Sequence, residues 1–293
     1  MNTTNQALKW IVWAGLFLIT LTPLFVSSSL LFPFITGKAF FFKIVVDVIF
    51  AAYLILAVRD PQYMPKKSWL TYLVFIFLGV VLIADFFGIN PHKSFWSNFE
   101  RMEGFFLILH LALFYLVAGA NLVKEQWNRW VNTSIGVSVI VIIYGLFQIA
   151  GSIDIRQGAD RLDGTLGNAS YLAVYMLLNI GFALYLLAQN INKRWAQVTY
   201  GLIVLFQLFI IFRTATRGTI LGIGIAVLIS SVIYVWKAKG DVVGRKIAAG
   251  LLLLVLILVG TLYVAKDTTF VQSNTTLNRV ASLLSYKSLL NNA

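Results

Sequence analysis

The sequence predicts an all-α polytopic membrane protein with about nine transmembrane helices. Of its 293 residues, 59% are hydrophobic and only 12% are charged, and the mean hydropathy is +0.85. This composition lacks the polar surface that a water-soluble domain needs. Many apolar runs also reach about 20 residues, the length that crosses roughly 30 Å of hydrocarbon. Each run is expected to be helical, because an open sheet edge in lipid would leave backbone groups unpaired.

Nine apolar runs follow one another along the chain. They are expected near Trp10–Phe32, Phe40–Val58, Trp69–Gly88, Gly104–Leu122, Trp130–Gly151, Ala169–Ala188, Ala196–Phe212, Thr219–Trp236 and Ile247–Ala265. The first run is longer than a signal-peptide core and lacks a small-residue cleavage context, so it is interpreted as an uncleaved helix. Residues 1–265 are therefore expected to form the membrane domain. Residues 266–293 are expected to begin an extracytoplasmic loop, in which Thr276–Leu290 has the apolar spacing of an interfacial helix.

The basic residues favour a cytoplasmic N-terminus. With that orientation every inner loop is basic, as the positive-inside rule requires. Nearly half of the 23 Lys and Arg residues nevertheless remain on the outer side. Arginine there opposes the usual bias, and its planar fork suits phosphate groups. The outer surface is therefore expected to bind an anion.

Two short outer loops combine arginine with glycine at the start of an apolar run. The first is Arg161-Leu-Asp-Gly-Thr-Leu-Gly-Asn168, directly before the run at Ala169, and the second is Arg213-Thr-Ala-Thr-Arg-Gly218. Gly164 and Gly167 permit tight turns, and Asn168 and Ser170 are candidate helix caps. A helix start with free amide groups is itself an anion site.

A third outer loop contributes Arg101, which is flanked by Glu100 and Glu103, and Asp85 ends the preceding apolar run. A carboxylate is expected to hold Arg101 while its other donors face a phosphate. The structural alternative is that arginines at helix ends only reach lipid headgroups, with nearby acidic residues pairing with them.

Several function classes are excluded or disfavoured by composition. Without cysteine the chain has no disulfide and no thiolate nucleophile or ligand. Its two histidines, His92 and His110, are too separated for a metal site, so no metal or cofactor is expected. His110, within an apolar run, is expected to be buried and hydrogen-bonded, and Asp47, also within a run, to need a partner or water. The net charge of +12 is spread over both faces, which suits anionic lipid rather than nucleic acid.

Three motifs together resemble a known family. Ser94-Phe-Trp leads to Glu100, Arg101 and Gly104. Arg161-x-x-Gly-Thr-Leu-Gly-Asn168 then opens one helix, and Thr216-Arg-Gly218 opens a later one. In this order they look like the O-antigen ligase and O-antigen polymerase superfamily, and the resemblance covers nearly the whole chain. Members are GT-C-type glycosyltransferases of the bacterial cytoplasmic membrane, active on its extracytoplasmic face.

The resemblance implies a glycan donor carried on undecaprenyl pyrophosphate and an acceptor hydroxyl on lipid A core, a growing polysaccharide or a protein. It also implies transfer with inversion and without nucleotide sugar, metal or other cofactor. Arginines would then compensate the pyrophosphate charge. The residues implied for this role are Arg217, Arg161, Arg213, Arg101 and Arg279, with Asp163, Asn168, Glu100 and Asp85 in support.

The chain departs from the family pattern at two places. Asn168 is followed by Ala169-Ser170, where the family usually has Pro-Asn. The family's catalytic histidine lies in a large outer loop after the ninth span, and the sequence reaches only Ala293. A fragment or truncated product without the general base is therefore expected, and His92, which lies outside any such motif, is not promoted to that base.

Two other functions stay open. A transporter or flippase of lipid-linked sugars would also need a cationic outer vestibule, but it should carry ionisable residues or broken helices near the membrane midplane. A non-catalytic assembly partner is the third interpretation.

Overall fold

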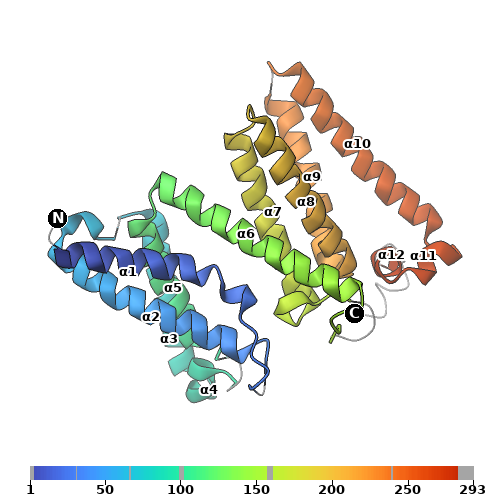
Figure 1. Ribbon diagram of the computed structural model, residues 1–293. Helices are drawn as coiled ribbons and strands as arrows, with labels where there is room; N and C mark the ends of the chain where they lie inside the picture. Colours follow the sequence, from blue (N-terminus) through green and yellow to red (C-terminus); the bar gives the residue numbers. More distant parts are fainter. Residues whose placement is uncertain are drawn as a thin grey trace. The chain divides into compact units, whose positions relative to one another are not determined.

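The computed structural model describes residues 3–30, 32–65, 67–98, 102–156, 161–238 and 240–282. These residues form twelve α-helices and three short 3₁₀ helices and contain no strand, so the predicted all-α class is confirmed (Figure 1). Contacts divide the chain into two compact units, Met1–Val141 and Ile142–Ala293. The long helix α6 (Lys124–Ile149) contains the division between them.

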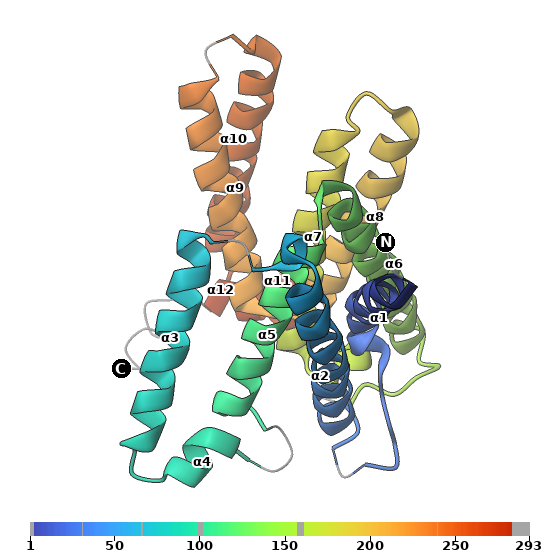
Figure 2. The ribbon, with the colours of Figure 1, turned by 90° about the vertical axis from the view of Figure 1, so that its left-hand side faces the viewer.

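The first unit holds the N-terminal helices. They are α1 (Thr3–Ile19), η1 (Thr22–Leu24), α2 (Thr36–Arg59), η2 (Pro61–Tyr63), α3 (Trp69–Phe86), α4 (Pro91–Trp96) and α5 (Phe105–Asn121). The short helix α4 joins the lower ends of α3 and α5 in Figure 2. The second unit holds η3 (Gly164–Leu166), α7 (Ala169–Gln189), α8 (Arg194–Arg213), α9 (Arg217–Lys237), α10 (Val242–Ala265), α11 (Thr269–Ser273) and α12 (Thr275–Ala281).

Seven described helices are long and apolar enough to cross a membrane: α2, α3, α6, α7, α8, α9 and α10. The protein is therefore a multi-pass membrane protein. The other two predicted spans correspond to shorter helices, α1 and α5, of 17 residues each. At a rise of about 1.5 Å per residue, each covers roughly 25 Å.

The predicted bounds of the first span are wrong. Its helix ends at Ile19 rather than Phe32. The Thr20 and Thr22 hydroxyls donate to the carbonyls of Phe17 and Ile19, both at 2.6 Å, and Pro23 has no N–H to continue the helix. The chain therefore leaves the helix through the 3₁₀ turn η1.

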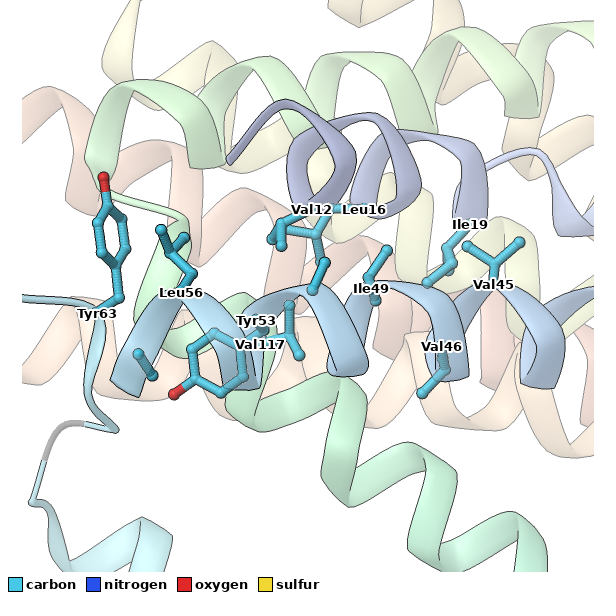
Figure 3. Packing of buried hydrophobic residues seen from close by; sticks show 12 residues of the cluster. Val12, Leu16, Ile19, Val45, Val46, Ile49, Tyr53, Leu56, Tyr63 and Val117 are labelled. Carbon is cyan, nitrogen blue, oxygen red and sulfur yellow. The ribbon is translucent and has the colours of Figure 1, made fainter. Parts of the chain in front are cut away.

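Helices α1 and α2 pack along most of their length and form the core of the first unit. Val12, Leu16 and Ile19 of α1 lie against Val45 and Ile49 of α2 (Figure 3). At Gly15 an added Cβ would lie 2.0 Å from the Ile49 side chain, so only glycine permits this approach. Trp130 of α6 donates its indole N–H to the Leu16 carbonyl at 2.9 Å and so ties α6 to the pair.

In the second unit the long helices pair as neighbours, α7 with α8 and α9 with α10 (Figures 1 and 2). The outward surfaces of α9 and α10 are largely exposed aliphatic side chains, as lipid-facing helices require. The short helix α12 packs against α9 and α10. It occupies the first half of the segment predicted as an interfacial helix, whose later residues, Leu283 to Leu290, lie outside the described residues.

Candidate functional site

The arginine-bearing loop before α7 is anchored by one amide side chain, that of Gln148 at the end of α6. Its Nε2 donates to Asp163 Oδ1 at 2.7 Å and to the Asp154 carbonyl at 3.1 Å. Its Oε1 accepts from the Gly164 N–H at 2.9 Å. The second Asp163 oxygen accepts from the Arg156 N–H at 3.0 Å. Because Gln148 and Asp163 are almost fully buried, these bonds fix the loop where water cannot compete.

Glycine and asparagine then turn the loop into α7. Gly164 and Gly167 have positive φ values of 55° and 64°, which glycine adopts without steric cost. Asn168 caps the helix, because its side-chain oxygen accepts from the N–H groups of Ser170 at 2.8 Å and Tyr171 at 3.3 Å. The predicted helix start at Ala169 and the Asn168 cap are therefore confirmed, whereas Ser170 lies inside the first turn.

Arg161 connects this loop to the turn between α8 and α9. Its Nε donates to the Thr214 carbonyl at 3.1 Å, and its Nη2 lies 3.5 Å from the Thr216 hydroxyl. The neighbouring Leu162 N–H donates to the Arg213 carbonyl at 3.2 Å. The Thr216 hydroxyl also lies 3.4 Å from the carbonyl of Ala169, the first residue of α7. The two predicted arginine loops therefore meet, and α7 and α9 begin beside each other.

Helix α12 brings a further arginine to this place. The Thr276 hydroxyl donates to the Phe212 carbonyl at 2.9 Å and so attaches α12 to the end of α8. Burial lowers the pKa of Arg161 below its ordinary value, and the positive charge of Arg279 on α12 lowers it further. The like charges of Arg161 and Arg279 thus lie close enough to repel each other.

Arg161, Arg213, Arg217 and Arg279, called here the arginine cluster, have no carboxylate partner among the residues that the structure describes. The Nε atoms of Arg213 and Arg279 are buried and make no hydrogen bond. Arg217, the first residue of α9, is exposed. Leaving a buried donor unpaired costs about 1–3 kcal/mol, so an anionic acceptor at this place would be favourable.

The other residues predicted for the site are Arg101, Glu100, Asp85 and Asp163. Arg101 and Glu100 lie outside the described residues. Asp85 lies in the first unit, at the end of α3, where its Oδ2 is buried without a hydrogen bond. Asp163 supports the site through Gln148 and the backbone.

Sequence reasoning missed Gln148 and Thr214, and it named Thr216 only as part of a motif, without a role in the site. Gln148 is a polar residue near the end of an apolar run, and this was the one available signal. The Thr214 contribution is a backbone carbonyl, which leaves no trace in residue type. The turn also contains Ala215 at a positive φ of 49°, a conformation that a non-glycine residue adopts rarely.

No group of His, Cys, Asp or Glu side chains suited to a metal ion occurs among the described residues. Comparisons of the chain with protein-family models, with curated proteins and with solved structures found no match.

Proposed function

We propose that the protein is an O-antigen ligase-like glycosyltransferase of the bacterial cytoplasmic membrane. It would move a glycan from undecaprenyl pyrophosphate to an acceptor hydroxyl on lipid A core, a growing polysaccharide or a protein, on the outer face. In this proposal α1 and α5 join the seven longer helices as spans, giving nine in a GT-C-like arrangement.

The observation that carries the proposal is the pair of buried, unpaired Nε atoms of Arg213 and Arg279 beside Arg161. Guanidinium groups bind phosphate oxygens through several parallel hydrogen bonds, and these are stronger than neutral ones. A pyrophosphate offers enough acceptor oxygens for several arginines at once. It would pair these donors and screen the repulsion between Arg161 and Arg279.

The convergence of two helix starts supports the same ligand. The hydroxyl of Thr216, the cap residue of α9, lies 3.4 Å from the carbonyl oxygen of Ala169, the first residue of α7. The N-terminus of each helix carries partial positive charge and free amide groups. Both helix ends therefore add to the attraction that the arginines exert on an anion.

The proposed reaction places the arginines on the leaving group. The acceptor oxygen forms a bond to the anomeric carbon from the opposite side, and the bond from that carbon to the pyrophosphate oxygen breaks. Negative charge then grows on the departing undecaprenyl pyrophosphate, and the acceptor hydroxyl gives its proton to a general base, a role that is assigned to no residue of this chain. Preorganised arginines stabilise such developing charge and so lower the barrier.

Binding of undecaprenyl-pyrophosphate-linked glycan to the purified protein in nanodiscs tests the proposal. Arg217→Ala and Arg279→Gln should each weaken binding by about 10- to 100-fold, since a hydrogen bond to a charged group contributes about 1.5–3 kcal/mol. Arg194→Gln, at the opposite end of α8 from Arg213, is the matched control and should bind like the parent. Unchanged binding in both cluster variants, with unfolding midpoints also unchanged, would contradict a pyrophosphate site.

One observation favours the transporter alternative. Asp47 lies midway along the membrane-spanning helix α2 and pairs with His110 of α5, which is the kind of intramembrane ionisable residue that transporters carry. Vesicles that contain the protein, lipid-linked glycan and an acceptor separate the two functions. Glycan transfer to the acceptor supports the enzyme, whereas movement of the glycolipid across the bilayer without transfer supports the transporter.

A further inference from the structure

The first unit contains an ionisable pair that the arginine cluster does not use. His110 Nε2 lies 3.1 Å from Asp47 Oδ1, and His110 Nδ1 lies 2.6 Å from the Phe106 carbonyl oxygen. Asp47 belongs to α2 and His110 to α5, two helices in contact, and Asp47 lies midway along α2. Ionisable groups at this depth are costly, and they usually carry out a function.

The two hydrogen bonds of His110 limit where protons can lie in the pair. A carbonyl oxygen only accepts, so Nδ1 must carry a hydrogen. A neutral imidazole has its second nitrogen as an acceptor, and Nε2 would then present a lone pair to the lone pairs of an ionised carboxylate. The contact is attractive only when one more proton lies between them, either on Nε2 or on Asp47. The geometry therefore favours a pair that holds this extra proton.

The two partners differ sharply in exposure. The His110 side chain is 3% exposed, whereas the Asp47 side chain is 62% exposed on the surface of the first unit. His110 is held from two directions, by the Phe106 carbonyl and by the Phe106 ring, whose centroid lies 4.4 Å from that of the imidazole. The buried imidazole is thus held by its partners, whereas the carboxylate lies at the surface of the first unit.

The nearby cation has its own partners. Lys43, one helical turn before Asp47 on α2, donates to the Met102 carbonyl at 3.1 Å and lies over the Phe106 ring at 5.4 Å. Its charge also interacts with that of Glu103. The remaining charged groups on α2 and the helices against it are Lys38 and Arg59 on α2 and Lys9 on α1, with Asp60 capping η2. No other described group is hydrogen-bonded to Asp47.

We propose that Asp47 and His110 form a proton-binding site inside the membrane-spanning part of the first unit, with Asp47 as its point of exchange. The site takes one proton, which is shared between Nε2 and the carboxylate. On release, the Nε2–H bond breaks and the proton passes to Asp47 and then to water as hydronium. The electron pair stays on Nε2, so the charge of the pair changes from zero to minus one.

Histidine NMR tests the site directly, because the chain has only two histidines. The His92→Gln protein, labelled with ¹⁵N-histidine and reconstituted in nanodiscs, reports on His110 alone. Over a series of pH values, one proton should leave the pair. If the proton leaves from His110, the ¹⁵N spectra should show the loss of the Nε2 proton. If it leaves from Asp47, ¹³C-aspartate spectra should show that this carboxyl ionises. The Asp47 signal is the one that is absent from the Asp47→Asn protein.

The Asp47→Asn substitution in the His92→Gln background separates a proton site from a merely structural contact. The asparagine amide can donate to Nε2, so His110 should stay neutral, with a proton on Nδ1 only, throughout the titration. Asp60→Asn is the control at a half-buried carboxylate outside the pair and should leave the proton signals of His110 unchanged. A retained Nδ1–H signal shows that His110 still meets the Phe106 carbonyl in each variant.

Two results would overturn the proposal. One is a parent protein in which Asp47 is ionised and His110 carries only the Nδ1 proton over the whole pH range. The other is an Asp47→Asn protein in which His110 titrates as it does in the parent, because the proton would then belong to the histidine alone.

Discussion

Gln148 is the residue on which the position of the arginine-bearing loop most depends. Its amide donates to Asp163 and to the Asp154 carbonyl and accepts from the Gly164 N–H, all in a buried region. We expect Gln148→Leu to lower the free energy of unfolding by about 2 kcal/mol, since a charged acceptor and a backbone donor lose their buried partner. Thermal unfolding in detergent measures this. Gln6→Leu, at an exposed position of α1, should leave the midpoint near that of the parent, and equal midpoints for both variants would contradict the role of Gln148.

For single residues, the sequence was enough to select the charged candidates for the site, but it did not predict which groups they contact. Arg161, Arg213, Arg217 and Arg279 stood out because the predicted orientation places them on the translocated side of the membrane, where arginine is unusual. Their meeting depends on how α7 to α12 pack, and the sequence contains no local signal of that packing. The partner that holds Arg161 is the backbone carbonyl of Thr214. Every residue type has this carbonyl, so the residue type at position 214 does not reveal the contact.

Among the elements, the contact between α1 and α2 depends on a missing side chain. A Cβ at Gly15 would lie 2.0 Å from the Ile49 side chain, so Gly15→Ala must move one helix or force Ile49 out of its rotamer. We expect the free energy of unfolding to fall by about 1–3 kcal/mol, as overpacked cores show.

Gly79→Ala in α3 is the control, because nothing lies within 4 Å of an added Cβ there. It should be neutral or slightly stabilising, since alanine favours the helix more than glycine does. Equal midpoints for the two variants would show that the helices are not in such close contact.

The turn between α9 and α10 should respond to acid. Asp241 accepts from the Tyr234 hydroxyl at 2.7 Å and from the Gly244 N–H at 2.8 Å, and these bonds lower the pKa of its carboxyl below the ordinary value of 3.8. Because the folded state has the lower pKa, the carboxylate stabilises the turn above pH 3.8, and this contribution is lost as the pH falls through the folded-state value.

Asp241→Asn should remove this acid dependence, because its amide oxygen still accepts from Gly244 but does not titrate. Hydrogen exchange of the first-turn amides of α10 at a series of pH values below about 5 would measure the effect. If the parent and Asp241→Asn lose protection in parallel as the pH falls, the carboxylate is not responsible.

Helix boundaries were predictable where a side chain marks them. Asn168 and the glycines before it predicted the start of α7 correctly, because the cap is made by adjacent residues. The end of α1 was predicted wrongly, because apolar residues continue past Ile19 and hydropathy outweighed the signal of Thr20, Thr22 and Pro23. A run of apolar residues shows that a segment suits lipid, whereas hydrogen-bonding side chains and proline decide where its helix ends.

For the whole molecule, the central expectation is the side of the membrane on which the arginine cluster lies. The helix α7 has 21 residues and a length of about 31 Å, which is enough to cross a bilayer and would place its two ends on opposite sides. The basic loops favour a cytoplasmic position for the turn after α7 and an extracytoplasmic position for the loop before it. The absence of cysteine makes the chain suitable for a test with single cysteines.

Ser152→Cys and Asn192→Cys place one exposed thiol on each side of α7. The test uses cells whose cytoplasmic membrane is intact and whose outer layers admit the reagent. In these cells a membrane-impermeant maleimide should label the cysteine at position 152 and not the one at position 192. After the membrane is opened, both should react, which controls for accessibility of each thiol. The opposite pattern would place the arginine cluster in the cytoplasm, where a lipid-linked glycan that has already crossed the membrane could not reach it. Labelling of both cysteines in intact cells, or of neither, would show that α7 does not cross the bilayer, and the proposed site would then lack the membrane setting on which its donor depends.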